Sequence, residues 1–392
     1  MTARCPMASR RGLLAGIAAL GAVRTVGAQP AAETFWGDHQ GGIITPQQSH
    51  TYFMAFDVAA SKKSELVAML RAWTLAAARL SDEAKSSRLT LTFGFGPGLF
   101  HGDRFGIAGQ RPESLVALKS FTGDQLVPAR CDGDLSVQAC ADDPQIGFNA
   151  VREMISLGYG LAQPKWAQSG FLPTTRAGET ARNLMGFKDG THDPIATGGV
   201  VPAVRPGLSP DQIVWVGDEG PAWLRGGSYL VARRIRISLE HWDRTDVEFQ
   251  QEVIGRYKTS GAPIGATDEF APPDFDAVDG DGNPRIAEDS HLRLASPAFN
   301  QGAEMLRRGY GYNDGLSFTA ERWPPWRQGM MLDAGLFFLA YQKDPRSGFI
   351  PVFESMSRLD ALHQYTTHVG SGLFACPPGA SPGGYIGDKL FG

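Results

Sequence analysis

Hydrophobic residues follow two different spacings in the first quarter of the chain. Residues 49–58 (SHTYFMAFDV) and residues 88–95 (RLTLTFGF) have the alternating, aromatic-rich character of strands. Between them, apolar residues recur every three or four positions after Ser61, a residue type that often caps helices. This spacing predicts a helix whose buried face consists of Leu66, Met69, Leu70, Trp73, Ala77 and Leu80.

The same two patterns continue to residue 171. A further strand is predicted at residues 135–141, a helix at about residues 145–161 and an extended segment near Trp166. The resulting order β-α-β-β-α-β is typical of a ferredoxin-like unit.

A second set of elements follows a similar order in the second half of the chain. We predict strands at residues 227–237, 331–341 and 370–376 and helices at about residues 242–257 and 353–365. Roughly seventy residues, Lys258 to Met330, precede the second of these strands, which is too long for a plain connection, so functional residues are expected there. The chain is therefore predicted to be an α+β protein made of two ferredoxin-like domains with antiparallel sheets.

The N-terminus has the layout of an export signal. The pair Arg10-Arg11 precedes an apolar run from Ala15 to Val23, and small residues follow up to Ala28. This layout resembles a twin-arginine signal, and the apolar run is too short to span a membrane comfortably. Because the twin-arginine route carries folded proteins, it suits a chain that acquires a cofactor in the cytoplasm. We therefore expect a periplasmic or secreted protein.

These patterns divide the chain into four parts. We assign residues 1–28 to the signal peptide, 35–171 to an N-terminal domain, 172–225 to a linker and 226–392 to a C-terminal domain.

The composition is that of a globular protein without an excess of basic residues. Of the 392 residues, 42% are hydrophobic and 20% are charged, which suffices for one large core or two ordinary ones. The 37 Lys and Arg residues and 41 Asp and Glu residues give a net charge of −4, so nucleic acid is not expected as a partner. No membrane span is expected in the mature chain.

Three cysteines remain after the signal peptide, namely Cys131, Cys140 and Cys376. Their odd number and the lack of a C-x-x-C spacing argue against a structural zinc site. Cys131 and Cys140 could form a disulfide outside the cytoplasm, but buried free cysteines are common, so the sequence leaves their pairing open.

One candidate for chemistry lies in the linker, in the segment NLMGFKDGT at residues 183–191. It places Asp189 between Gly186 and Gly190, and glycines let a backbone approach a flat ligand closely while one acid points toward it. Taken alone, this segment is also typical of an ordinary Asp-Gly turn.

A second candidate is His291, within the segment DSHLRLASP of the long insertion. Arg307 and Arg308 follow sixteen and seventeen positions later. A lone histidine is more often a structural residue than a ligand. The H-E-x-x-H and G-x-S-x-G motifs are missing, which argues against a zinc protease and an α/β-hydrolase.

Five segments together resemble the bacterial dye-decolorising peroxidases. They are FWGDHQGGIITPQQSHTYFMAFD, GFKDGT, DSHLRLASP, LRRGYGY and LFFLAYQKDPRSGFIP. Taken in this order they are similar to the twin-arginine-exported branch that is linked to iron acquisition, the deferrochelatase/peroxidase type.

The resemblance implies one haem b per chain, held by the C-terminal half. His291 matches the axial ligand of the haem iron, Asp189 the distal acid and Arg307 the distal arginine. Asp360 matches the acid that accepts a hydrogen bond from the proximal histidine, and Asp344 and Asp333 are the alternatives for that acid. Phe338 matches the aromatic residue that packs over haem, and further haem contacts are implied for Gly186, Phe187, Gly190, Thr191 and Arg308.

These residue types suit the implied chemistry. A carboxylate on one ring nitrogen of a histidine fixes its tautomer and makes the other nitrogen more electron-donating. Asp189 can take a proton from one peroxide oxygen and return it to the other, and Arg307 supplies a fixed positive charge where the departing oxygen becomes negative.

We therefore predict a haem peroxidase that uses hydrogen peroxide to oxidise bulky organic reductants such as dyes and phenols in one-electron steps. The alternative is a haem-binding iron-supply protein that takes iron from haem or oxidises ferrous iron. The expected partners are peroxide and organic reductants, with an iron permease system and a second copy of the chain as further candidates.

Overall fold

The structure is a computed structural model that describes residues 34–175, 179–191, 208–320 and 328–392. The predicted signal peptide, residues 1–28, lies outside the described residues. Within them, nine strands form one sheet in the order β5-β9-β2-β3-β1-β4-β7-β8-β6, and every strand pair is antiparallel. Strand β8 also pairs with β5, so the sheet closes on itself.

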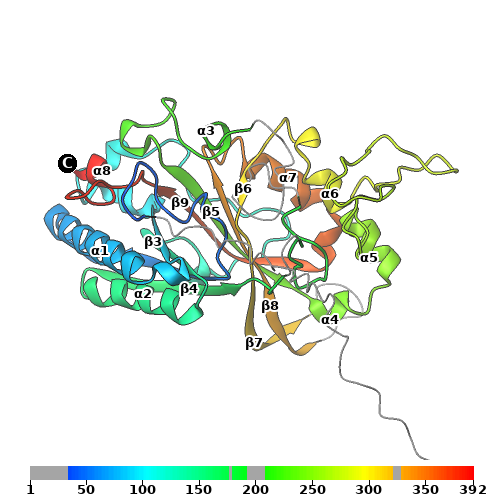
Figure 1. The fold of residues 1–392 in the computed structure, drawn as a ribbon, viewed down its shortest axis with the longest axis horizontal. Coiled ribbons are helices and arrows are strands. Elements are labelled where there is room, and N and C mark those ends of the chain that lie inside the picture. Colours follow the sequence, from blue (N-terminus) through cyan, green and yellow to red (C-terminus); the bar gives the residue numbers. More distant parts are fainter. Residues whose placement is uncertain (1–33, 176–178, 192–207, 321–327) are drawn as a thin grey trace, which may run out of the picture. The chain divides into compact units, whose positions relative to one another are not determined.

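The first four strands form the order β2-β3-β1-β4, and two long helices pack beside them (Figure 1). Their bounds are β1 His50–Val58, α1 Lys63–Glu83, β2 Thr90–Phe95, β3 Leu135–Ala141, α2 Pro144–Leu157 and β4 Ala162–Phe171. The predicted apolar face of α1 is buried, apart from a partly buried Leu80. Ser61 lies one residue before the cap position, Lys62, and binds the side chain of Glu65.

The second half supplies the remaining strands. Their bounds are β5 Ser228–Ile237, β6 Leu306–Arg307, β7 Tyr310–Ala320, β8 Gln328–Gln342 and β9 Thr366–Cys376. The predicted strands at 227–237, 331–341 and 370–376 are confirmed. Short helices complete this half, namely α3 Pro210–Ile213, α4 Leu239–Trp242, α5 Val247–Ile254, α6 His291–Leu294, α7 Phe349–Leu359 and α8 Asp388–Phe391.

Three predicted helices are shorter or more broken than expected. The helix predicted at 145–161 ends at Leu157, because Gly158 and a left-handed Gly160 (φ 77°) turn the chain into β4. The helix predicted at 242–257 is split into α4 and α5, and α5 ends at the left-handed Gly255 (φ 83°). The helix predicted at 353–365 ends at Leu359, because the Asp360 side chain accepts a hydrogen bond from the Leu362 backbone and starts a separate 3-10 turn.

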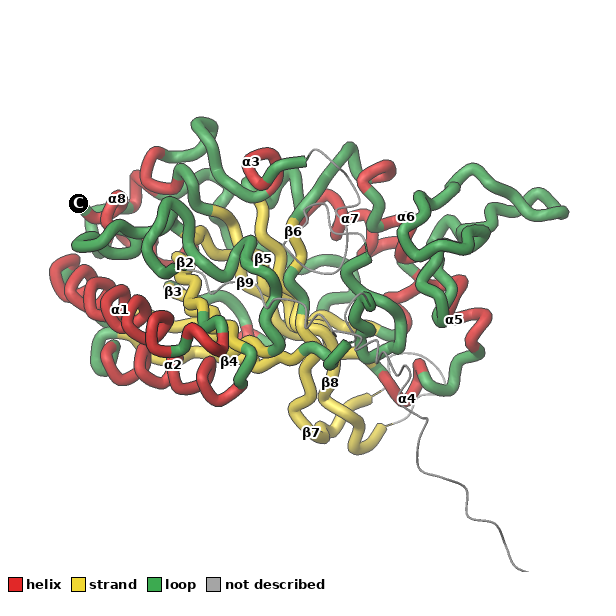
Figure 2. Tube along the Cα trace, viewed as in Figure 1, coloured by secondary structure: helices red, strands yellow, loops and turns green. Residues whose placement is uncertain are grey.

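The interpretation of residues 258–330 as one insertion is wrong. Its last part contains β6 and β7, and β7 pairs with β8 from Tyr310↔Phe337 to Ala320↔Gln328. Glycines and the polar pair Asn313-Asp314 give β7 a low intrinsic strand propensity, so only its pairing with β8 reveals it. The stretch between α5 and α6 is drawn almost entirely as loop (Figure 2).

The two halves share a core. Phe53 of β1 contacts Phe337 of β8 and Phe374 of β9, with ring centroids 5.5 and 5.9 Å apart. The described residues, from 34 to 392, accordingly belong to a single compact unit. Cys131, Cys140 and Cys376 are free thiols in this unit. Across the described residues, no helix is both long and apolar enough to cross a membrane.

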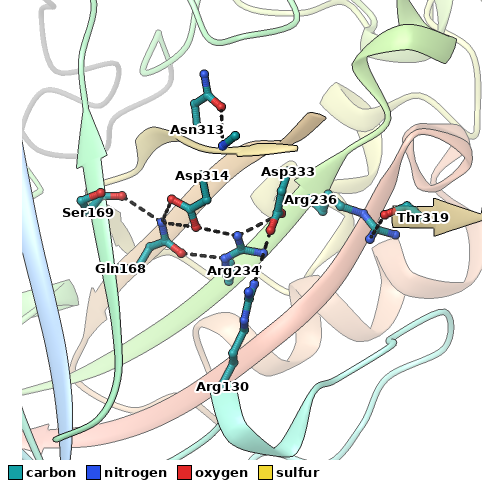
Figure 3. A network of polar contacts seen from close by, with 10 residues as sticks. Arg130, Gln168, Ser169, Arg234, Arg236, Asn313, Asp314, Thr319 and Asp333 are labelled. Carbon is teal, nitrogen blue, oxygen red and sulfur yellow. Dashed lines mark hydrogen bonds and ion pairs between the residues drawn. The ribbon is translucent and has the colours of Figure 1, made fainter. Parts of the chain in front are cut away.

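A buried arginine reinforces the seam between the halves, where β4 and β7 share a single backbone pairing, Phe171↔Gly311. Arg234 of β5 donates to Gln168 of β4 at 2.6 Å (Figure 3). It also donates to Asp314 of β7 at 2.8 Å and to Asp333 of β8 at 3.0 Å. Arg234 therefore links β4 to β7, which the backbone joins only weakly.

Candidate active site

A histidine–aspartate pair joins α6 to the end of α7. The Nδ1 atom of His291 lies 2.7 Å from Oδ2 of Asp360, whose side chain is completely buried. The second carboxylate oxygen of Asp360 accepts a hydrogen bond from the Leu362 backbone at 2.8 Å. With a carboxylate as acceptor, Nδ1 carries the proton and Nε2 keeps its lone pair. His291 can therefore offer Nε2 to a metal.

The charge of Asp360 governs the acid–base behaviour of His291. Burial alone would lower the pKa of His291, but the Asp360 carboxylate outweighs burial and raises the pKa above its usual value. Arg307 and Asp189 act on the same pKa, in the lowering and the raising direction respectively. These four charged or titratable side chains thus form one electrostatic group.

The structure distinguishes the three candidates for the acid beside His291. Asp344 pairs with Arg346 at 2.8 Å, and Asp333 pairs with Arg234 at 3.0 Å. Of the three candidates, Asp360 is the one that binds His291.

Asp189 and Arg307 form the second pair of the site. The Nη1 atom of Arg307 lies 3.7 Å from Oδ1 of Asp189, and each side chain is about one-third exposed. Arg307 belongs to β6 and pairs with Ala340 of β8, whereas Asp189 comes from the segment before β5. The arrangement leaves an acid and a permanent cation side by side, with access to solvent.

The loop that carries Asp189 has the shape expected for its two glycines. Gly186 and Gly190 have φ values of 85° and 96°, which other residues rarely adopt. A Cβ atom built on Gly190 would meet no atom of the described residues within 4 Å, so among these residues the backbone there is open to a ligand. At Gly186 such an atom would lie 2.9 Å from the Lys258 side chain, so this glycine serves the packing of the loop.

Two other residues of the loop hold it in place. Phe187 is 2% exposed and packs edge-on against Trp242, with ring centroids 6.0 Å apart. The hydroxyl of Thr191 donates to Glu269 at 3.1 Å. The structure therefore shows both side chains engaged with protein.

Phe338 lies on the same face of the sheet as Arg307, whereas Arg308 points elsewhere. Ala340 is the strand partner of Arg307, and Phe338 is two positions from Ala340, so Phe338 and Arg307 lie on the same face of the sheet. Arg308 is 3% exposed and donates to Thr45 at 2.5 Å and to Gln48. The structure thus directs Arg308 away from the Asp189–Arg307 pair and toward the segment before β1.

Sequence reasoning missed the role of Lys188 and Glu269. Glu269 binds three residues of the segment that carries Asp189, namely Thr180, Lys188 and Thr191. Lys188 and Glu269 are 81 positions apart, and no motif surrounds Glu269, so no local signal indicates the contact.

The residues of the site fit a haem group. One histidine with a free Nε2 and a buried carboxylate behind it is a typical axial ligand of haem iron. Among the described residues, no group of three or more His, Cys, Asp or Glu side chains is placed to hold a metal ion by itself. The open backbone at Gly190 and the shared face of Phe338 and Arg307 suit a flat ligand.

Comparisons with known proteins agree with this interpretation. The Dyp-type peroxidase N-terminal and C-terminal family models match residues 40–172 and 180–381. A dye-decolorizing peroxidase of Thermobifida fusca is 37% identical, covering 90% of this chain and 83% of that protein. A deferrochelatase of Escherichia coli is 34% identical, covering 97% of this chain and 96% of that protein.

Solved structures show the same relationship. Ferric DtpA from Streptomyces lividans has a TM-score of 0.82 and 38% identity, covering 92% of this chain and 97% of that chain. A DyP-type peroxidase from Cellulomonas bogoriensis has a TM-score of 0.80 and 35% identity, covering 93% of this chain and 99% of that chain. The chain therefore belongs to the Dyp-type peroxidases, a family of haem enzymes that use hydrogen peroxide to oxidise organic reductants such as dyes.

Proposed function

We propose that His291 is the axial ligand of the haem iron and that Asp189 and Arg307 act on hydrogen peroxide in this peroxidase. The observation that carries the proposal is the pairing of His291 with the buried Asp360 at 2.7 Å, together with an Asp189–Arg307 pair at 3.7 Å whose two charges act on the pKa of His291. Bound haem would supply the iron centre that accepts electrons from organic reductants after it has reacted with peroxide.

Each of these side chains then has one task. Nε2 of His291 would bind the iron, and Asp360 keeps the proton on Nδ1 and makes the imidazole more electron-donating. Asp189 takes a proton from one peroxide oxygen and returns it to the other. The guanidinium group of Arg307 stabilises the negative charge that develops on the departing oxygen.

We propose further that each half of the protein is a ferredoxin-like domain and that the second holds one haem b. The strand orders support this. The first half has the order β4-β1-β3-β2. The second half has the corresponding order β9-β5-β8-β7. His291, Arg307 and Asp360 all belong to the second half, and the Asp189 loop reaches them from the segment before β5.

Residues 1–28 support export by the twin-arginine route, which would place the enzyme in the periplasm or outside the cell. The relatives named deferrochelatase, matched over 97% of this chain, favour iron supply as a second candidate function. An iron permease is the partner that we propose for that function. A homo-oligomer is the remaining partner hypothesis.

One experiment separates the two functions. The purified holoenzyme is given peroxide with a dye or a phenol, and in a parallel assay haem with a reductant. Dye oxidation that is lost in Asp189→Asn supports the peroxidase. Release of protoporphyrin from haem, without dye oxidation, would instead support iron supply.

A further inference from the structure

We infer that Glu269 is a positioning residue that holds Asp189 in place for the peroxide reaction. The inference rests on the proposed role of Asp189 and extends it to a residue of the long loop between α5 and α6. Among the described residues, the side-chain contacts of Glu269 are with Thr180, Lys188 and Thr191 and not with the Asp189 carboxylate. Glu269 binds residues that precede and follow Asp189 in the chain.

The contacts of Glu269 enclose the loop. Its Oε1 atom accepts hydrogen bonds from Thr180 and, at 3.1 Å, from Thr191, and its Oε2 atom pairs with the Lys188 ammonium. Lys188 and Thr191 stand one position before and two positions after Asp189. One carboxylate therefore anchors the beginning of the loop and both flanks of the proposed acid.

The Lys188–Glu269 ion pair is largely buried and is not an exposed surface contact. The side chains of Lys188 and Glu269 are 19% and 10% exposed. Gly261 packs against the stem of Lys188 so closely that a Cβ atom at Gly261 would lie 2.6 Å from Cδ. A charge pair at this depth loses more when one partner is removed than an exposed pair does.

The backbone of Glu269 is itself fixed by a buried arginine. The buried Arg256 donates from Nη1 to the backbone carbonyls of Gly261 at 2.7 Å and Glu269 at 3.1 Å. The backbone N–H of Asp189 donates to the carbonyl of Ala181 at 2.8 Å. This bond ties Asp189 to the beginning of the same loop. The Asp189 backbone is thus clamped between two anchored segments.

Two effects on Asp189 follow from this arrangement. A proton-transferring carboxylate must be held close to its working position, because a displacement of about 1 Å can cost on the order of a hundredfold in rate. Glu269 also neutralises the Lys188 ammonium, while Asp189 forms its ion pair with Arg307. Loss of the Glu269 charge would release a second cation beside the proposed acid.

The test uses the holoenzyme with Glu269→Gln and Lys188→Met, and with Glu252→Gln, an exposed acid of α5, as the matched control. We expect kcat/KM for peroxide to fall roughly ten- to a hundredfold in the first two variants. The KM for the dye and the Soret band should stay as in the wild type, because His291 is held by Asp360. The control should match the wild type in every measurement.

A double-mutant cycle shows whether Glu269 acts through Asp189. In the Asp189→Asn background, Glu269→Gln should cause no further loss in kcat/KM for peroxide. The exchanged pair Lys188→Glu with Glu269→Lys should recover part of the loss. A full additional loss in the Asp189→Asn background, or unchanged peroxide kinetics in Glu269→Gln and Lys188→Met, would overturn the inference. If Asp189→Asn alone is as fast as the wild type, the proposed role of Asp189 fails instead.

Discussion

The carboxylate of Asp360 lies 2.7 Å from Nδ1 of His291, and its side chain is fully buried whereas a third of the His291 side chain remains exposed. The partner of the imidazole is therefore shielded from water, while the imidazole itself faces the site. This asymmetry keeps the negative charge of Asp360 effective, because water does not screen it.

Asp360→Asn should retain haem but raise the reduction potential of the iron and lower peroxidase turnover. The imidazole loses its anionic partner and becomes a weaker electron donor. Spectroelectrochemical titration of the variant against wild type measures the shift. An unchanged potential would show that Asp360 does not tune the axial ligand.

His291→Ala should abolish stable ligation of haem iron, because the imidazole nitrogen left free by Asp360 is lost. The absorption spectrum of the purified variant, read at the Soret and ferric ligand-field bands, checks this. His101→Ala, at an exposed histidine outside the site, is the control. Wild-type bands in His291→Ala would exclude His291 as the ligand.

Asp189→Asn and Arg307→Leu should each lower kcat/KM for peroxide, by about a hundredfold or more. The first variant removes the proton carrier and the second removes the fixed positive charge. Stopped-flow mixing with peroxide measures the effect, and Asp276→Asn, at an exposed acid, serves as the control. Wild-type rates in Asp189→Asn would leave Arg307 alone with the task.

The carboxylate of Glu269 should make the free energy of unfolding decrease as the pH falls through the acidic range. Burial opposes its charged form, but hydrogen bonds from Lys188, Thr180 and Thr191 prevail and lower the pKa of Glu269 in the folded protein. A carboxylate whose folded pKa lies below the unfolded value, about 4.3, contributes stability above that value and loses it as pH falls through the folded pKa.

The melting temperatures of wild type and Glu269→Gln measured from pH 7 to pH 3 check this. The advantage of the wild type should be full at neutral pH and should shrink below about pH 4.3. An advantage that stays constant over the range would contradict the assigned direction.

Arg234→Met should destabilise the protein by about 3 kcal/mol. The change removes the hydrogen-bond donor of the buried Gln168 and leaves Asp333 with only the longer contact to Arg130, at 3.8 Å. Asp314, whose side chain is 37% exposed, can turn to water. Chemical denaturation measures the loss. Arg236→Met is the matched control on the same strand, because Arg236 has a single hydrogen bond in this network, to Thr319 at 3.2 Å (Figure 3). Equal losses in both variants would contradict a special role for Arg234.

Local patterns predicted most of the elements, and the failures have a common cause. The strand at 135–141 and the buried face of α1 follow from the spacing of apolar residues, which is a property of neighbouring positions. Strand β7 was not predicted, because its glycines and its Asn313-Asp314 pair give no such pattern. Its extended form depends on pairing with β8.

The sequence by itself determined the family and named His291, Asp189, Arg307 and Asp360 as candidates, because these residues lie in short segments that can be recognised one at a time. Only the tertiary structure decided that Asp360, and neither Asp333 nor Asp344, binds His291, and that Arg308 turns toward Thr45 and Gln48. Only the tertiary structure brought Glu269 to Lys188 across 81 positions. An ion pair needs two atoms within a few ångströms, and the packing of whole segments sets that distance, which no local spacing records.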